Sequence, residues 1–129
     1  MNEFNRTLVL LQGDLEQLDM RTHPERLRYK LYPIYINLLL NKNFFKNNID
    51  IKPLCNDLSL AFKDYVYRSR TLLVARIIRS IELADQKDLL TYVKVAKKYI
   101  YAYTDKVENT DKNTNNDSNF IDKFGRKDG

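Results

Sequence analysis

Between residues 62 and 104 the chain contains nine lysines and arginines and four acidic residues. These basic groups are the part of the chain that could carry binding chemistry. The basic positions are 63, 68, 70, 76, 79, 87, 94, 97 and 98. Guanidinium groups bind phosphate oxygens through paired hydrogen bonds, and ammonium groups attract them as point charges. A basic, tyrosine-containing helical surface is typical of a protein that contacts a polyanion such as nucleic acid.

The stretch 62–83 predicts one long amphipathic helix. At 100° per residue, its apolar side chains fall on one broad arc, and Arg68, Arg76 and Arg79 fall together on the far side. Arg68 and Arg79 are three turns apart, about 16 Å along the axis. This spacing would let them reach separate phosphates, although Glu82 lies near Arg79 and would neutralise part of its charge.

Arg70 does not fit this helix, because it projects into the middle of the apolar arc. Either the helix begins later, or Arg70 is partly buried and paired. A buried arginine needs an acid, since an unpaired one is costly. Asp57 and Asp64 are the nearest candidates in sequence. A core ion pair and a ligand contact both stay open for Arg70.

The helix that follows Asp85 continues the basic pattern. Lys87, Thr91, Lys94 and Lys98 share one face, and Lys97 is adjacent to it. Tyrosines near the same region could stack on bases or sugars, although tyrosines at the edge of a core are the commoner case. We therefore predict a continuous nucleic-acid-contacting surface over both helices, made of Arg68, Arg70, Arg76, Arg79, Lys87, Lys94, Lys97, Lys98 and Tyr67. The alternative is a solvated charged face without a ligand.

Residues 51–71 also have the outline of a helix-turn-helix. A short helix over 51–58 would be followed by a turn at Ser59, and a second helix would present Lys63, Asp64, Tyr67 and Arg68 to a major groove. The turn position usually prefers Gly, and Arg68 occupies a position that normally packs inward. The pattern is therefore weak.

Residue types that carry catalysis or hold metals are scarce in this chain. There is one cysteine, Cys55, and one histidine, His23, which reads as a surface or capping residue. Ser69 and Ser80 have no base near them in sequence, and no Gly-rich phosphate loop exists. We expect a non-enzymatic protein without metal or cofactor, although a metal-dependent nuclease built from scattered acids stays open.

The elements that must position these groups are predicted to be helices. Three Gly and three Pro in 129 residues favour a helical bundle over a turn-rich sandwich or barrel. Apolar periodicity predicts helices over 3–19, 22–32, 51–58 and 62–83, and a last one from Asp85 to about residue 104. The second begins with Thr22 and Glu25 as a capping box, with a kink or break at Pro33. Residues 34–40 also fit strand alternation, but we favour helix.

The chain is expected to form one all-α domain of four to five helices over residues 1–104. Residues 105–129 are polar and without periodicity, so we expect a disordered tail. Phe120, Ile121 and Phe124 in that tail are either a short docking motif or an incidental cluster. The last 25 residues hold six acidic and five basic side chains, a net charge of −1, so residues 1–104 carry +6 and the whole chain carries +5. The N-terminus lacks signal-peptide features, and no run approaches the roughly 18–20 apolar residues that span a bilayer. A cytoplasmic location is expected.

Two main hypotheses follow from the sequence. The first is a small nucleic-acid-binding protein, either a regulator or an accessory subunit of a nucleoprotein complex, that contacts the phosphates of DNA or RNA. The second is an interaction module whose N-terminal apolar stripe, within residues 4–18, pairs with its own copy or with a partner helix. The stripe consists of Phe4, Leu8, Leu11, Leu15 and Leu18. A membrane-surface role through the basic amphipathic helices is a third possibility.

Overall fold

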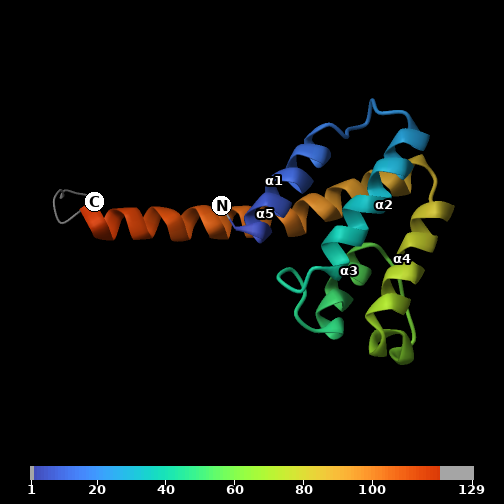
Figure 1. Cartoon of the computed structure of the whole chain (residues 1–129). Helices are drawn as coiled ribbons and strands as arrows, with labels where there is room; N and C mark the ends of the chain where they lie inside the picture. Colours follow the sequence, from blue (N-terminus) through green and yellow to red (C-terminus); the bar gives the residue numbers. More distant parts are fainter. Residues whose placement is uncertain (1, 120–129) are drawn as a thin grey trace.

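The computed structural model describes the backbone of residues 2–119 and the side chains of residues 2–103. Within this range it contains five α-helices, two short 3-10 helices and no strand, which confirms the predicted all-α bundle. The elements in Figure 1 are α1 (Glu3–Glu16), α2 (Pro24–Leu40), η1 (Asn48–Ile51), α3 (Lys52–Asp57), η2 (Asp64–Arg68), α4 (Arg70–Leu83) and α5 (Gln86–Asn119).

Helix α2 is the centre of the bundle, because it packs against both α4 and α5. Its residues 34–40 are helical, as predicted. The fully buried Tyr35 donates a hydrogen bond of 2.6 Å from its hydroxyl to the backbone oxygen of Tyr92 on α5. The two rings meet edge to face, with centroids 5.6 Å apart. This contact joins α2 to α5 in the middle of the core.

Helix α1 buries the apolar stripe that the second hypothesis assigned to a partner. Leu8, Leu11, Leu15 and Leu18 are all buried, and Phe4 packs against the same core. Helix α1 rests chiefly on α5. The stripe is therefore occupied by the chain's own bundle, and residues 4–18 do not offer it as a docking surface.

Helix α2 begins one residue later than the predicted capping box. His23, not Thr22, is the N-cap, and its Nδ1 accepts a hydrogen bond of 3.1 Å from the backbone N–H of Glu25. Pro24 occupies the first turn, where its missing N–H costs little.

Helix α2 also runs through Pro33 without the break that we considered. Pro33 is exposed, and so is Tyr29, whose carbonyl would have accepted the missing hydrogen bond.

The helix-turn-helix prediction is wrong, because no α-helix follows the turn at once. Helix α3 ends in a Schellman motif: Ser59 has a φ of 60°, and the N–H of Leu60 bonds to the carbonyl of Cys55 at 2.8 Å. Residues 61–63 are irregular, and Lys63, Asp64, Tyr67 and Arg68 lie on or beside the 3-10 helix η2. They therefore do not form a recognition helix.

Helix α4 begins at Arg70, eight positions after the predicted start at 62. Ser69 is its N-cap, and the Ser69 hydroxyl accepts a hydrogen bond of 3.1 Å from the N–H of Leu72. Arg68 precedes this cap in η2. The spacing of three helical turns between Arg68 and Arg79 therefore does not exist.

Helix α5 follows Asp85, where the sequence placed its start, and the Asp85 carboxylate caps it by accepting a 2.9 Å hydrogen bond from the N–H of Asp88. The last side chain described on it, Tyr103, meets Phe4 and Phe44 in a cluster of rings with centroids 5.1–5.9 Å apart. The helical backbone continues past the bundle to Asn119 (Figure 1), where we expected no regular structure. The apolar trio of the tail, Phe120, Ile121 and Phe124, lies outside the described residues.

Candidate nucleic-acid interface

Arg70 is a structural residue inside the bundle. Its guanidinium donates to the carbonyl oxygens of Leu39 (2.7 Å) and Phe45 (2.8 Å) and to Oδ1 of Asn48 (2.8 Å), with a longer contact to the Lys46 carbonyl. The predicted late start of α4 and partial burial of Arg70 are therefore confirmed, and the predicted ion pair with an acid is wrong. Its partners are neutral oxygens, not Asp57 or Asp64, and Leu39 lies in the last turn of α2, where the helix dipole attracts a cation.

Arg28 makes the matching contact at the other end of the same helix pair. From the first turns of α2, its Nη1 donates to the carbonyls of Ile81 (2.7 Å) and Glu82 (2.8 Å) in the last turn of α4. It also pairs with Glu25 at 3.2 Å. Each of the two antiparallel helices thus supplies an arginine that caps the C-terminus of the other. We call this arrangement the reciprocal arginine caps.

Three more of the predicted phosphate contacts already have partners. Arg79 forms an ion pair with Glu82, as its spacing suggested. Lys98 bonds to the carboxylate of Asp57 on α3 at 2.9 Å, and Asp57 also accepts from the Tyr99 hydroxyl. Lys98 is therefore held by an acid of α3. Arg76 is exposed and donates to the Tyr65 hydroxyl at 3.1 Å.

Tyr67 cannot stack on a base, because only 8% of its surface is exposed. Burial is the main cause that raises the pKa of Tyr67 to about 12, and a hydrogen bond with the Cys55 thiol acts in the same direction. Burial also raises the pKa of Cys55, which is fully enclosed. The pair is a packed core contact beneath η2, so the predicted surface loses its only aromatic member.

Four of the predicted residues form no ion pair within 4 Å among the described side chains. They are Arg68, Lys87, Lys94 and Lys97. Arg68 is exposed at the end of η2. Lys87, Lys94 and Lys97, which we call the lysine triad, follow one face of α5. Lys87 and Lys94 are exposed and Lys97 is half-buried. Of the predicted strip, the lysine triad is gathered around one hollow, and no arginine lines that hollow.

The lysine triad surrounds a hollow of about 440 Å³ between α5 and the α1–α2 connection. Four apolar side chains line this lysine hollow: Leu18, Met20, Leu90 and Val93. Leu18 and Val93 are buried and form its floor, while Met20 is 75% exposed and stands at its edge. The periodicity of α5 could reveal the lysines, but nothing in the sequence showed that the α1–α2 connection would lie against them.

Asp19 is the one acidic group that lines the lysine hollow. The Arg21 guanidinium bonds to it at 3.1 Å, and the Arg21 backbone N–H bonds to its other oxygen at 2.8 Å. These hydrogen bonds lower the pKa of the Asp19 carboxyl, and the nearby charge of Lys97 acts in the same direction. Asp19 therefore stays ionised and is a hydrogen-bond acceptor beside the ammonium groups.

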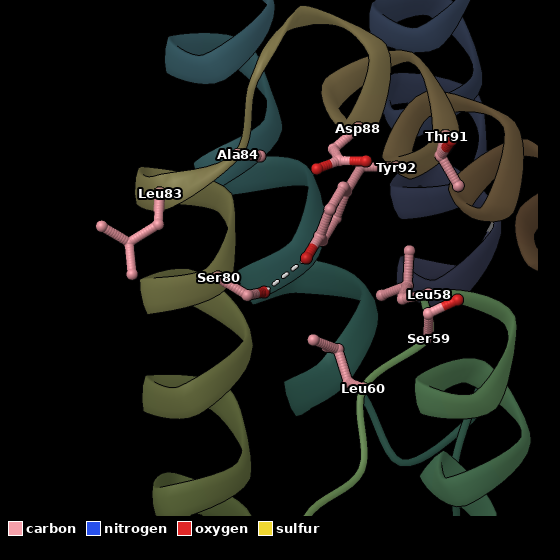
Figure 2. A pocket seen from close by; sticks show the side chains of 9 residues that line it. All are labelled: Leu58, Ser59, Leu60, Ser80, Leu83, Ala84, Asp88, Thr91 and Tyr92. Carbon is pink, nitrogen blue, oxygen red and sulfur yellow. Dashed lines mark hydrogen bonds between the residues drawn. The ribbon is translucent and has the colours of Figure 1, made fainter.

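A second hollow of about 410 Å³ lies between the end of α4, the start of α5 and the segment after α3 (Figure 2). Tyr92 reaches across it from α5 and donates a 2.6 Å hydrogen bond to the Ser80 hydroxyl, which itself donates to the Ile77 carbonyl. Both hydroxyls are thus engaged with the protein. Asp88 also lines this hollow, which has no basic side chain in its lining.

The described residues contain no group of three or more His, Cys, Asp or Glu side chains placed to hold a metal ion. Over the same part of the chain, no helix combines the length and apolarity required to cross a bilayer. The chain matches no family model, and neither a curated protein nor a solved structure shows significant similarity to it.

Proposed function

We propose that this protein is a non-enzymatic nucleic-acid-binding protein that contacts backbone phosphates through the lysine triad. One observation supports this proposal: three ammonium groups gather on one face of α5 without an ion pair to any described acid. Lys87 and Lys97 are ten residues apart, about 15 Å along the helix, so the three groups could meet successive phosphates. Arg68 is a further free cation that a longer ligand could reach.

The proposal is narrower than the sequence indicated, because three main phosphate contacts replace eight. Counterion release gives a slope of log K against log salt of about −0.7 per contact for single strands and about −0.9 for duplexes. Three contacts therefore predict affinity that falls about 20-fold to 40-fold between 50 and 200 mM salt. Such a protein would act as a regulator or an accessory subunit of a nucleoprotein complex in the cytoplasm, as the sequence suggested.

Fluorescence anisotropy with labelled 20-nucleotide DNA and RNA, each single- and double-stranded, tests this proposal across a salt series. Substituting Lys87, Lys94 and Lys97 by Glu should abolish measurable binding. The matched control changes three exposed lysines elsewhere, Lys42, Lys46 and Lys63, to Glu and alters the net charge equally. It should lose far less affinity. Equal loss in both triple variants would show diffuse attraction without a site and would refute the proposal.

A further inference from the structure

The lysine hollow combines two chemistries that are joined in a nucleotide. Its floor is apolar and suits the face of a base, and the lysine triad around it suits the phosphates on either side of that base. Its volume of about 440 Å³ lies within the range of ordinary ligand pockets, roughly 300–1,000 Å³. A surface that binds phosphates alone needs no such apolar floor.

The carboxylate of Asp19 adds a feature that separates nucleic acid from other anionic ligands. Ionised Asp accepts hydrogen bonds, and the amino groups on base edges are donors that a carboxylate can read. An acidic amphipathic peptide has apolar and anionic groups as well, and Asp19 repels its carboxylates as it repels phosphates, but an ionised carboxylate gives Asp19 no hydrogen-bond donor. The lining therefore favours a base over an acidic side chain.

We propose that the lysine hollow receives an unstacked base of a single-stranded nucleic acid whose flanking phosphates contact the lysine triad. This inference rests on the proposed function and specifies its ligand. Bases inside a duplex are stacked and paired, and extruding one costs free energy. The protein should therefore prefer single strands to duplexes, through apolar contacts from Met20 and Leu90, the two apolar side chains of the lining that are not fully buried.

Three labelled ligands of equal length test the inference by anisotropy at 100 mM salt: a mixed-sequence single-stranded DNA 20-mer, its duplex, and an abasic 20-mer with the same number of phosphates. The single strand should bind at least about 5-fold more tightly than the abasic oligomer, which is the lower end of what one stacked base contributes. The duplex should bind more weakly than the single strand. An acidic amphipathic peptide should compete poorly.

Met20→Ala isolates the apolar part of the hollow, because Met20 is 75% exposed and its truncation leaves the core intact. This variant should lose most of the difference between the single strand and the abasic oligomer and keep the affinity for the latter. Leu10→Ala, at a residue that is 68% exposed on α1 and outside the hollow, is the matched control and should change neither.

Equal binding of the single strand and the abasic oligomer would overturn the inference, as would duplex affinity that equals single-strand affinity. A peptide that displaces the oligonucleotide better than unlabelled DNA would assign the hollow to a protein partner instead. If all oligomers bind equally but lose affinity when the lysine triad is changed, the proposed function stands and the base site does not exist. If none binds, both fail.

Discussion

Replacing Arg70 by Ala should destabilise the bundle by about 3–5 kcal/mol. The guanidinium donates three hydrogen bonds of 2.7–2.8 Å, to Leu39, Phe45 and Asn48. A hydrogen bond from a charged donor contributes roughly 1.5–3 kcal/mol, and a buried acceptor without a partner costs roughly 1–3 kcal/mol. Bonds within one network do not add fully, so the sum is reduced to the stated range. This loss is a large share of a typical stability of about 5–15 kcal/mol.

Urea denaturation followed by far-UV circular dichroism measures this loss through the shift of the midpoint at constant slope. Arg76→Ala is the control, since Arg76 lies on the same helix and makes one exposed contact to Tyr65. It should change stability by no more than about 0.5 kcal/mol. Arg70→Lys should fall between the two, because a single ammonium group cannot reproduce the fork. Arg70→Ala that is as stable as Arg76→Ala would refute the assigned role.

The other predictions concern separate parts of the bundle. Arg28→Ala should cost about 2–3 kcal/mol in the same assay, because two last-turn carbonyls of α4 lose a charged donor; a loss below about 0.5 kcal/mol would contradict the capping role. Ser59→Gly should raise stability by up to about 1 kcal/mol, since it relieves a left-handed backbone at φ 60°. Cys55 should react with a thiol reagent only on unfolding, because burial raises its pKa and blocks access; rapid labelling of the native protein would disprove this. The pKa of Tyr67 is raised to about 12 in the folded state, so its contribution to stability is complete below pH 10 and lost as the pH rises to 12. Tyr67→Phe should reduce that alkaline decline of the urea midpoint without removing it, because burial also raises the pKa of Tyr35, Tyr92, Tyr99 and Tyr101; an unchanged decline would count against the assignment.

Local patterns in the sequence were enough to identify the helices. The leucines of α1 repeat at helical spacing and are buried together, and Asp85 could be recognised as a cap from the three residues that follow it. Both features involve residues within one or two turns of each other. The predicted break of α2 at Pro33 was wrong, because the helix continues through it. Pro33 is exposed, so the hydrogen bond that its ring removes costs little free energy there.

Contacts between distant residues decided the rest, and no sequence pattern reports them. Arg70 misfit the apolar arc, which correctly indicated a late helix start or a buried role, but its carbonyl partners lie 25 and 31 positions away. Arg28 gave no signal, since its partners on α4 are more than 50 positions distant. The Lys98–Asp57 pair, 41 positions apart, removed one predicted ligand contact in the same way.

The location of α1 has a consequence for how the chain matures during translation. Helix α1 is made before α5, on which it chiefly rests. About 90 residues separate the end of α1 from Tyr103, so at roughly 5–20 residues per second the ribosome needs about 4–18 s to supply the partner. For that interval the leucines of α1 have only the smaller contact with α2 to cover them, so the nascent chain presents apolar surface that a chaperone could shield.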